Sequence, residues 1–159
     1  MIRVQADDFD LGAEMKALTG ARQDIGAVVS FTGKVRDFGG TKGEGEETLA
    51  AMTLEHYPGM TEKMLADIEA EALKRWDLQE SLIIHRYGRL EPGDQIVLVI
   101  TASAHRQDAF EANAFLMDWL KTKAPFWKLE ESNQGRNWVE AKKEDDEAAA
   151  RWQDQGHED

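Results

Sequence analysis

The chain of 159 residues is 42% hydrophobic and 31% charged, which predicts one folded domain and excludes general disorder. Its 19 basic residues stand against 31 acidic ones, a formal net charge of -12 that repels polyphosphate and excludes general nucleic-acid binding. It has no cysteine, which excludes disulfides, thiolate metal ligands, a cysteine nucleophile and a persulfide carried on the protein itself.

The hydropathy pattern indicates neither a membrane segment nor an export signal. The N-terminal residues MIRVQADDFD are acidic where a signal peptide needs an apolar region. The longest apolar runs, such as Ile96 to Ala102, are far shorter than the roughly 20 residues of a membrane-spanning helix. We therefore expect a cytoplasmic protein without a membrane partner.

The first half of the chain predicts two strands around a loop, followed by a helix. Residues 25–35 and 48–57 are rich in β-branched and apolar side chains, the pattern of strands. Residues 36–47 are glycine-rich and charged, which predicts a loop that a ligand can order. The helix is predicted from apolar residues that recur at spacings of three and four: Met60, Met64, Leu65, Ile68, Ala72 and Trp76.

The second half begins with two strands and a long helix. The strands, residues 81–90 and 94–102, are joined through the turn sequence EPGD, which predicts an antiparallel pair. The helix is predicted from about Ala104 to Lys123, with Ser103 as its N-cap. Pro125 sets its end, because residues before a proline disfavour helical geometry.

Residues 126–132 and 136–142 predict a closing hairpin, with Trp127 and Trp138 as packing residues. From residue 143 onward acidic side chains dominate, so we expect a short, frayed helix and a disordered end. The predicted division is a single domain at 1–142 and an acidic tail at 143–159. Helices interspersed with strand pairs predict an α+β fold.

The sequence SAHR, Ser103 to Arg106, lies where a predicted strand is followed by a helix. Backbone N–H groups and the helix dipole favour an anion at such a point, and His105 and Arg106 add hydrogen-bond donors. This pattern indicates a phosphate site. A structural alternative stays open, in which Arg106 pairs with a nearby carboxylate and His105 caps the helix or packs.

Three lysines lie close together in LKTKAPFWK, Leu120 to Lys128. Lys121 and Lys123 fall in the last turn of the predicted helix, where the dipole favours cations. Lys128 follows two aromatic residues, and partial desolvation there would make it a usable general acid or base. A functional lysine pair and ordinary solvated lysines are both consistent with this pattern.

The segment FTGKVR, Phe31 to Arg36, places Lys34 and Arg36 on one face of a strand end, as part of a binding site or as a solvated edge. His56 and His85 lie within apolar strand patterns and are interpreted as structural. The sequence has no HExxH-type motif, no paired carboxylate array and no GxSxG nucleophile elbow. It therefore predicts no metal site and no bound cofactor.

Five segments in this order, FTGKVRD, LEHYPGMTEKML, IHRYGRLEPGD, SAHRQDAFEA and LKTKAPFWKLE, make the chain resemble the large, catalytic subunit of molybdopterin synthase. The resemblance extends from about Ile25 to Lys142. It implies an enzyme of molybdenum cofactor biosynthesis that transfers sulfur to cyclic pyranopterin monophosphate (precursor Z), forming the dithiolene of molybdopterin. It also implies an α/β hammerhead-type fold with an additional antiparallel β subdomain.

The resemblance further implies partners and site residues. Sulfur arrives as the C-terminal thiocarboxylate of a small ubiquitin-like subunit that ends in Gly-Gly, and a homodimer of large subunits forms the core of a heterotetramer. The two catalytic lysines of the family fall on Lys121 and Lys128. The anionic pterin substrate is bound, in part by the second protomer, through residues that match Phe31, Arg36, His105, Arg106 and Lys142.

Lys142 departs from the family pattern, which often has an arginine after WVEA. A lysine keeps the charge but loses the planar fork that binds phosphate through two parallel hydrogen bonds, so its role in substrate binding is open. A function of another class also fits the sequence: a non-catalytic anion-binding module that docks a ubiquitin-like partner without turnover.

Overall fold

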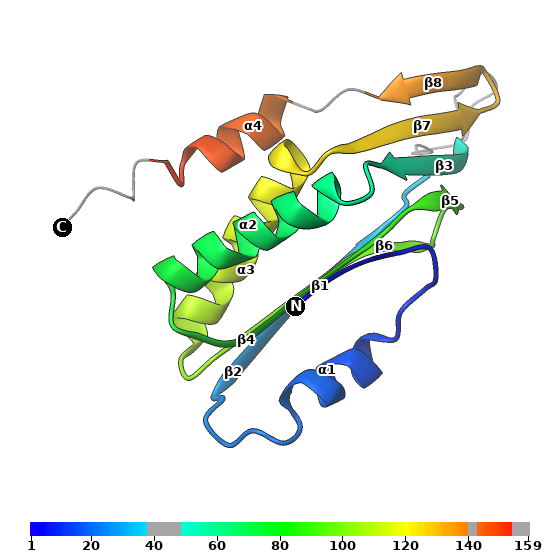
Figure 1. Cartoon of the computed structure of the whole chain (residues 1–159). Coiled ribbons are helices and arrows are strands. Elements are labelled where there is room, and N and C mark those ends of the chain that lie inside the picture. Colours follow the sequence, from blue (N-terminus) through cyan, green and yellow to red (C-terminus); the bar gives the residue numbers. More distant parts are fainter. Residues whose placement is uncertain (38–48, 140–142, 154–159) are drawn as a thin grey trace.

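The computed structural model describes residues 1–37, 49–139 and 143–153. Two four-stranded sheets form its framework, and the α+β class is confirmed (Figure 1). Sheet A is mixed, because β1 and β4 run parallel while the other neighbours run antiparallel. In spatial order its strands are β1 (Ile2–Gln5), β4 (Leu78–Arg86), β6 (Gln95–Ser103) and β2 (Ala27–Lys34).

Sheet B is antiparallel throughout and lies at one end of sheet A (Figure 1). In spatial order its strands are β5 (Gly88–Leu90), β3 (Leu49–His56), β7 (Phe126–Ser132) and β8 (Gly135–Val139). The predicted closing hairpin is therefore present as β7 and β8, and it joins the edge of β3.

Helices cover both faces of sheet A (Figure 1). Helices α2 (Met60–Arg75) and α3 (Arg106–Lys123) lie on one face, and α1 (Leu11–Thr19) lies on the other. Helix α4 (Lys143–Ala150) packs against α3. None of the helices in the described residues combines the length and hydropathy that a bilayer crossing requires.

Successive residues of the central strands face two different cores, because side chains alternate along a strand. Ile83, Val97 and Val99 pack under α2 and α3. Leu82, Ile84, Leu98 and Ile100 pack under α1. Since both faces of sheet A are covered, the run at 96–102 is apolar at successive positions instead of at alternate ones.

The chain passes directly from sheet A into sheet B between β4 and β5. The sequence predicts one strand over residues 81–90, but the segment divides at Tyr87, and Gly88 to Leu90 pair with β3. Gly88 has a φ of 93°, a conformation that residues with a Cβ rarely adopt. The turn from one sheet to the other therefore depends on this glycine.

Helix α3 begins later than the sequence predicts. Ser103 is expected as the N-cap, but β6 continues through Ser103, whose hydroxyl donates to the carbonyl oxygen of Asp77 at 2.7 Å. His105 is the N-cap instead, and its side chain makes no capping hydrogen bond. The first turn of α3 therefore has no side-chain cap from His105.

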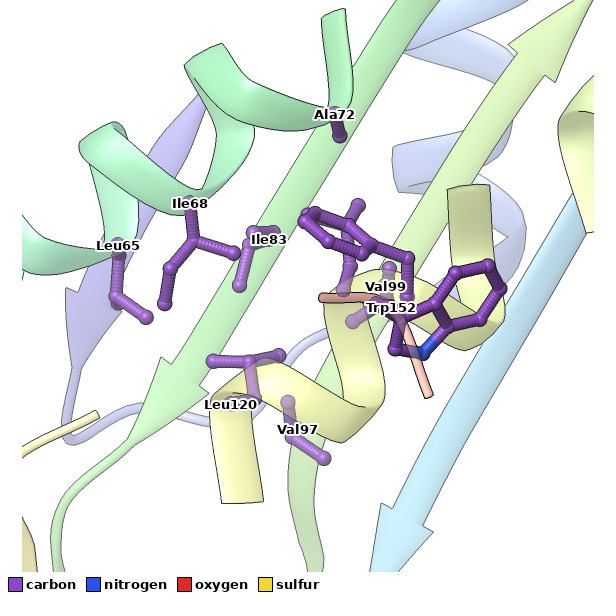
Figure 2. Close-up of a cluster of buried hydrophobic side chains, with 10 residues drawn as sticks. Leu65, Ile68, Ala72, Ile83, Val97, Val99, Leu120 and Trp152 are labelled. Carbon is purple, nitrogen blue, oxygen red and sulfur yellow. The ribbon is translucent and has the colours of Figure 1, made fainter. Parts of the chain in front are cut away.

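The segment after β8 contributes to the core. The sequence places an acidic tail from residue 143 onward, and the structure has α4 there, followed by Trp152, which is only 6% exposed. Figure 2 shows Trp152 within the cluster that α2 and α3 form on sheet A. Its ring meets the rings of Phe115 and Trp76 edge-on, at centroid distances of 5.7 and 5.6 Å. Trp152 therefore anchors this segment to the helix layer.

Candidate functional site

Lys121 and Lys128 lie on two elements that meet at a two-residue connection, Ala124–Pro125. Lys121 is in the last turn of α3 and Lys128 is in β7, and both side chains are exposed. The N–H of Phe126 donates to the carbonyl oxygen of Ala124 at 2.9 Å, so the chain turns tightly between helix and strand. Both lysines therefore lie at the end of the molecule that carries sheet B (Figure 1).

Lys128 has apolar neighbours across the sheet. It pairs with Leu54 of β3 and with Val139 of β8, and paired residues place their side chains on the same face. Leu54 is almost completely buried. The methylene groups of a lysine pack on such neighbours while its ammonium group stays in water. Lys128 therefore presents a positive charge at the margin of an apolar surface.

An aromatic group lies next to Lys128. His85 stacks on Phe126 with ring centroids 3.6 Å apart, and His56 packs on Tyr87 at 4.4 Å. Burial lowers the pKa of His85 to about 4, and the positive charge of Lys128 acts in the same direction. The sequence marks both histidines as structural but does not predict the stack, because His85 and Phe126 come from different sheets.

Arg36 lies beyond the end of β2. The sequence predicts that it shares a strand face with Lys34, but β2 ends at Lys34 after a shift in register. Val35 then donates its N–H to the carbonyl oxygen of Asp94 at 2.8 Å, beside the start of β6. Arg36 is exposed and lies at the same end of sheet A as sheet B.

Phe31 lies in the middle of β2 and is 40% exposed. It pairs with Val99, a core residue under α3, so its side chain lies on the face of sheet A that α3 covers. Gly33 makes room beside it, because a Cβ at position 33 would lie 2.7 Å from Cγ1 of Val97 and 3.4 Å from the ring of Phe31. The backbone of β2 therefore approaches its neighbours closely at Gly33.

His105 and Arg106 lie at the opposite end of the molecule from the lysines. Arg106 is the first residue of α3, and with a rise of about 1.5 Å per residue Lys121 is about 22 Å further along the axis. Both His105 and Arg106 are exposed. One copy of the chain therefore does not bring these two residues together with Lys121 and Lys128.

Lys142 and Lys123 do not belong to this lysine pair. Lys142 lies outside the described residues. The ammonium group of Lys123 lies 5.5 Å from the ring centroid of Trp119, a cation–π contact that gives it a structural role. In the part of the chain that the structure describes, no group of three or more histidine, aspartate or glutamate side chains is arranged to hold a metal ion.

Comparisons with known proteins agree with this fold and these motifs. The model of a family described as "MoaE protein" matches residues 4–123. The chain is 57% identical over 151 residues to the molybdopterin synthase catalytic subunit of Ralstonia nicotianae, covering 95% of this chain and 83% of the relative. It is 55% identical over 153 residues to that of Pseudomonas aeruginosa, covering 96% and 99%.

Solved structures give the same result. The molybdopterin biosynthesis MoaE protein from Burkholderia ambifaria aligns with a TM-score of 0.80 and 52% identity, covering 96% of this chain and 97% of that one. Molybdopterin synthase from Staphylococcus aureus aligns with a TM-score of 0.77 and 32% identity, covering 87% and 96%. The chain therefore belongs to the MoaE family, the catalytic subunits of molybdopterin synthase in molybdenum cofactor biosynthesis.

Proposed function

We propose that the chain transfers sulfur to cyclic pyranopterin monophosphate, forming the dithiolene of molybdopterin, with Lys121 and Lys128 as its catalytic residues. The observation that carries this proposal is the position of both lysines where α3 meets β7, beside the apolar neighbours of Lys128. The sulfur comes from the C-terminal thiocarboxylate of a small ubiquitin-like subunit. This thiocarboxylate and the substrate phosphate are both anions, which two ammonium groups attract to one place.

The two lysines divide two tasks between them. One ammonium group holds the thiocarboxylate through a charge-assisted hydrogen bond, which contributes about 1.5–3 kcal/mol. The other exchanges a proton with the pterin as the new carbon–sulfur bond forms, the role of a general acid or base. The acyl carbon–sulfur bond of the thiocarboxylate then breaks, and an oxygen from water or from the pterin takes the place of sulfur, so that the small subunit leaves with a carboxylate. The exposed Arg36, at the same end of sheet A, supplies a further cation for the substrate.

Single-turnover mass spectrometry of the pterin tests this proposal. Wild type, mixed with the substrate and a thiocarboxylated small subunit, is expected to add sulfur in two steps. Lys128→Ala and Lys121→Ala are expected to slow this by about 100-fold or more, the usual scale for loss of acid–base catalysis. Lys123→Ala is the matched control, because its ammonium group contacts Trp119. Full sulfur transfer by the Lys121→Ala, Lys128→Ala double variant would refute the lysine mechanism.

We also infer that the active site is shared between two copies of the chain. Arg106, Phe110, Met117 and Lys121 follow one another at intervals of four, seven and four residues, so they form one stripe along α3. The stripe flanks the edge strand β2, since the neighbouring Asn113 donates to a β2 carbonyl at 3.2 Å. Phe110 is 60% exposed, so its apolar ring is accessible to a second copy of the chain.

Two-fold symmetry explains how a second copy would complete the site. Arg106 and Lys121 are the two ends of the stripe, so its midpoint lies between Asn113 and Ala114. A second α3 packed antiparallel along this stripe would place its Arg106 beside Lys121 of the first copy, and the reverse. The phosphate site at His105 and Arg106 of one chain would then face the lysine pair of the other. Phe31, at the edge of β2, would form part of the wall between them.

Mixing two inactive variants tests the sharing. Arg106→Ala and Lys128→Ala are each expected to be inactive, but half of the dimers in a random one-to-one mixture hold one chain of each kind. One of the two sites in such a dimer is intact, so about one quarter of the wild-type activity is expected to return. If each chain holds a complete site of its own, the mixture stays inactive.

The sulfur-carrying partner follows from the same proposal. A Helicobacter pylori structure described as a complex of subunits 1 and 2 of molybdopterin-converting factor shares the fold, with a TM-score of 0.69 at 18% identity. We propose that this chain likewise binds a small subunit, and that a homodimer core with two small subunits forms a heterotetramer in the cytoplasm. Light scattering of the mixed subunits is expected to give a two-to-two complex. The α/β hammerhead type of the fold is an expectation from the resemblance, which superposition on that fold would test.

A further inference from the structure

His85 links the two sheets at the start of β7. It belongs to β4 in sheet A, whereas Phe126, on which it stacks, is the first residue of β7 in sheet B. The ring centroids are 3.6 Å apart and the ring planes differ by 15°. Within sheet A the residues paired with His85 are Val4 and Val97, so the ring has apolar neighbours there.

A hydrogen bond identifies the tautomer of His85. Its Nδ1 lies 2.8 Å from the carbonyl oxygen of Arg86. A carbonyl oxygen only accepts, so Nδ1 carries the hydrogen and donates, and Nε2 keeps its lone pair in the neutral ring. Because burial lowers the pKa of His85 to about 4, the ring is neutral at pH 7.

Lys128 lies beside this stack. Phe126 and Lys128 are two residues apart on β7, so their side chains lie on the same face of sheet B. The positive charge of Lys128 contributes to the lowered pKa of His85.

The other titratable groups around the ring come from three further elements. His56 of β3 has its Nε2 3.8 Å from Oε1 of Glu62 in α2, and its ring packs on Tyr87 between β4 and β5. A protonated His85 would repel both Lys128 and a protonated His56, whereas the neutral ring does not.

We propose that His85 is a positioning residue for Lys128: its neutral ring stacks on Phe126 and fixes the start of β7, and with it the direction of the Lys128 side chain. This inference rests on the proposed role of Lys128 in sulfur transfer. His85 acts through Phe126 and makes no contact with the reacting atoms. A displacement of a catalytic group by about 1 Å can cost about 100-fold in rate, so the stack has a measurable consequence.

Two substitutions separate the stack from simple filling of space. His85→Leu fills the same space with an apolar side chain of similar size but has no flat ring. His85→Phe keeps a flat neutral ring but loses the hydrogen bond to Arg86. We expect His85→Leu to lower the single-turnover rate by at least about tenfold with little change in the substrate concentration at half-maximal rate. His85→Phe is expected to recover most of that rate.

Two further readouts are taken at pH values where the compared proteins remain folded. The first is labelling of Lys128 by an amine-reactive ester over a range of pH, read by peptide mass spectrometry with the exposed Lys16 as internal reference. His85→Leu is expected to change the labelling of Lys128 relative to Lys16, and His85→Phe to restore it. The second is the pH profile: the wild-type rate relative to His85→Phe should fall as the pH approaches 4, where His85 gains its charge.

The outcomes distinguish this inference from the proposed function. If His85→Leu lowers the melting temperature but leaves the rate of the folded protein and the labelling of Lys128 unchanged, His85 is only structural and the inference is wrong. If Lys128→Ala, measured alongside, transfers sulfur like wild type, the proposed function of Lys128 fails. The labelling then still reports whether His85 sets the surroundings of Lys128.

Discussion

The indole Nε1 of Trp152 donates to Oδ2 of Asp118 at 2.6 Å, which ties the end of the described chain to the C-terminal half of α3. We predict that Trp152→Ala lowers the free energy of unfolding by about 3–5 kcal/mol, the usual cost of removing a buried tryptophan. Urea unfolding followed by far-UV circular dichroism measures this. Asp118→Asn, which keeps an oxygen acceptor for the indole, is expected to cost less than half as much. A loss below about 1 kcal/mol for Trp152→Ala would contradict the role of this residue as an anchor.

Asn113 connects α3 to two strands through one buried side chain. Its Nδ2 donates to the carbonyl oxygens of Val29 in β2 and Val99 in β6, at 3.2 and 3.1 Å. Asn113→Leu is expected to destabilise the protein by about 1–3 kcal/mol, because both oxygens lose a donor in a buried place. Asn113→Asp should cost more, since a buried carboxylate would face those oxygens. Thermal unfolding of the three proteins checks this order, and equal stability would refute it.

Gly33→Ala tests the close approach of β2 to its neighbours. The new Cβ would lie 2.7 Å from Cγ1 of Val97, so the strand or the side chain must shift. We expect a loss of stability of about 1–3 kcal/mol and, because Phe31 moves with the strand, a weaker affinity for the substrate.

The matched control for that substitution is Gly12→Ala in α1, where the new Cβ would meet only Oδ1 of Asp10 at 3.3 Å. This change replaces a helical glycine and should stabilise the protein or leave it unchanged. Calorimetry and isothermal titration with the pterin compare the two variants. An unchanged melting temperature in Gly33→Ala would show that the strand adjusts without cost.

The lowered pKa of His85 makes stability depend on pH. Its folded value is about 4, whereas the ordinary value is 6.5, so between these values the unfolded chain binds a proton that the folded chain does not. The free energy of unfolding therefore falls as the pH falls through this window. The contribution of His85 to stability is fully present only above pH 6.5. At pH 5 the expected loss from this one group is about 2 kcal/mol.

The comparison that isolates this effect is wild type against His85→Phe at pH 7 and pH 5. His56 and the carboxylates are present in both proteins, so their titration cancels in the difference. His85→Phe should gain about 2 kcal/mol relative to wild type on going from pH 7 to pH 5. A constant difference between the two proteins would show that His85 titrates normally.

The sequence predicts those elements whose signal is local. The helix from Met60 follows from apolar spacing, and β6 follows from the apolar run at 96–102 because two covered faces need such a run. The predicted N-cap of α3, Ser103, is wrong, because the pairing of Ser103 with two strands outweighs its preference for a cap position. The division of the segment 81–90 between two sheets depends on partners far away in the chain.

The candidate site shows the same limit more clearly. The motifs containing Arg106 and Lys121 are neighbours in the sequence, yet the helix between them holds the two residues about 22 Å apart. The order of the motifs along the chain alone does not predict the distance between Arg106 and Lys121 in the fold. Likewise, nothing local in the sequence predicts that His85 stacks on Phe126, because the two residues meet only when sheet B has formed beside sheet A.

The direct passage of the chain from β4 into β5 has a consequence for catalysis. Since a single residue, Tyr87, separates a strand of one sheet from a strand of the other, the two sheets cannot rotate apart like hinged domains without breaking backbone hydrogen bonds. Lys128 on sheet B and the helix layer on sheet A thus keep a constant relative orientation. The surface that we propose as the substrate site is therefore preorganised, and its ordering entropy is lost during folding, before any ligand binds.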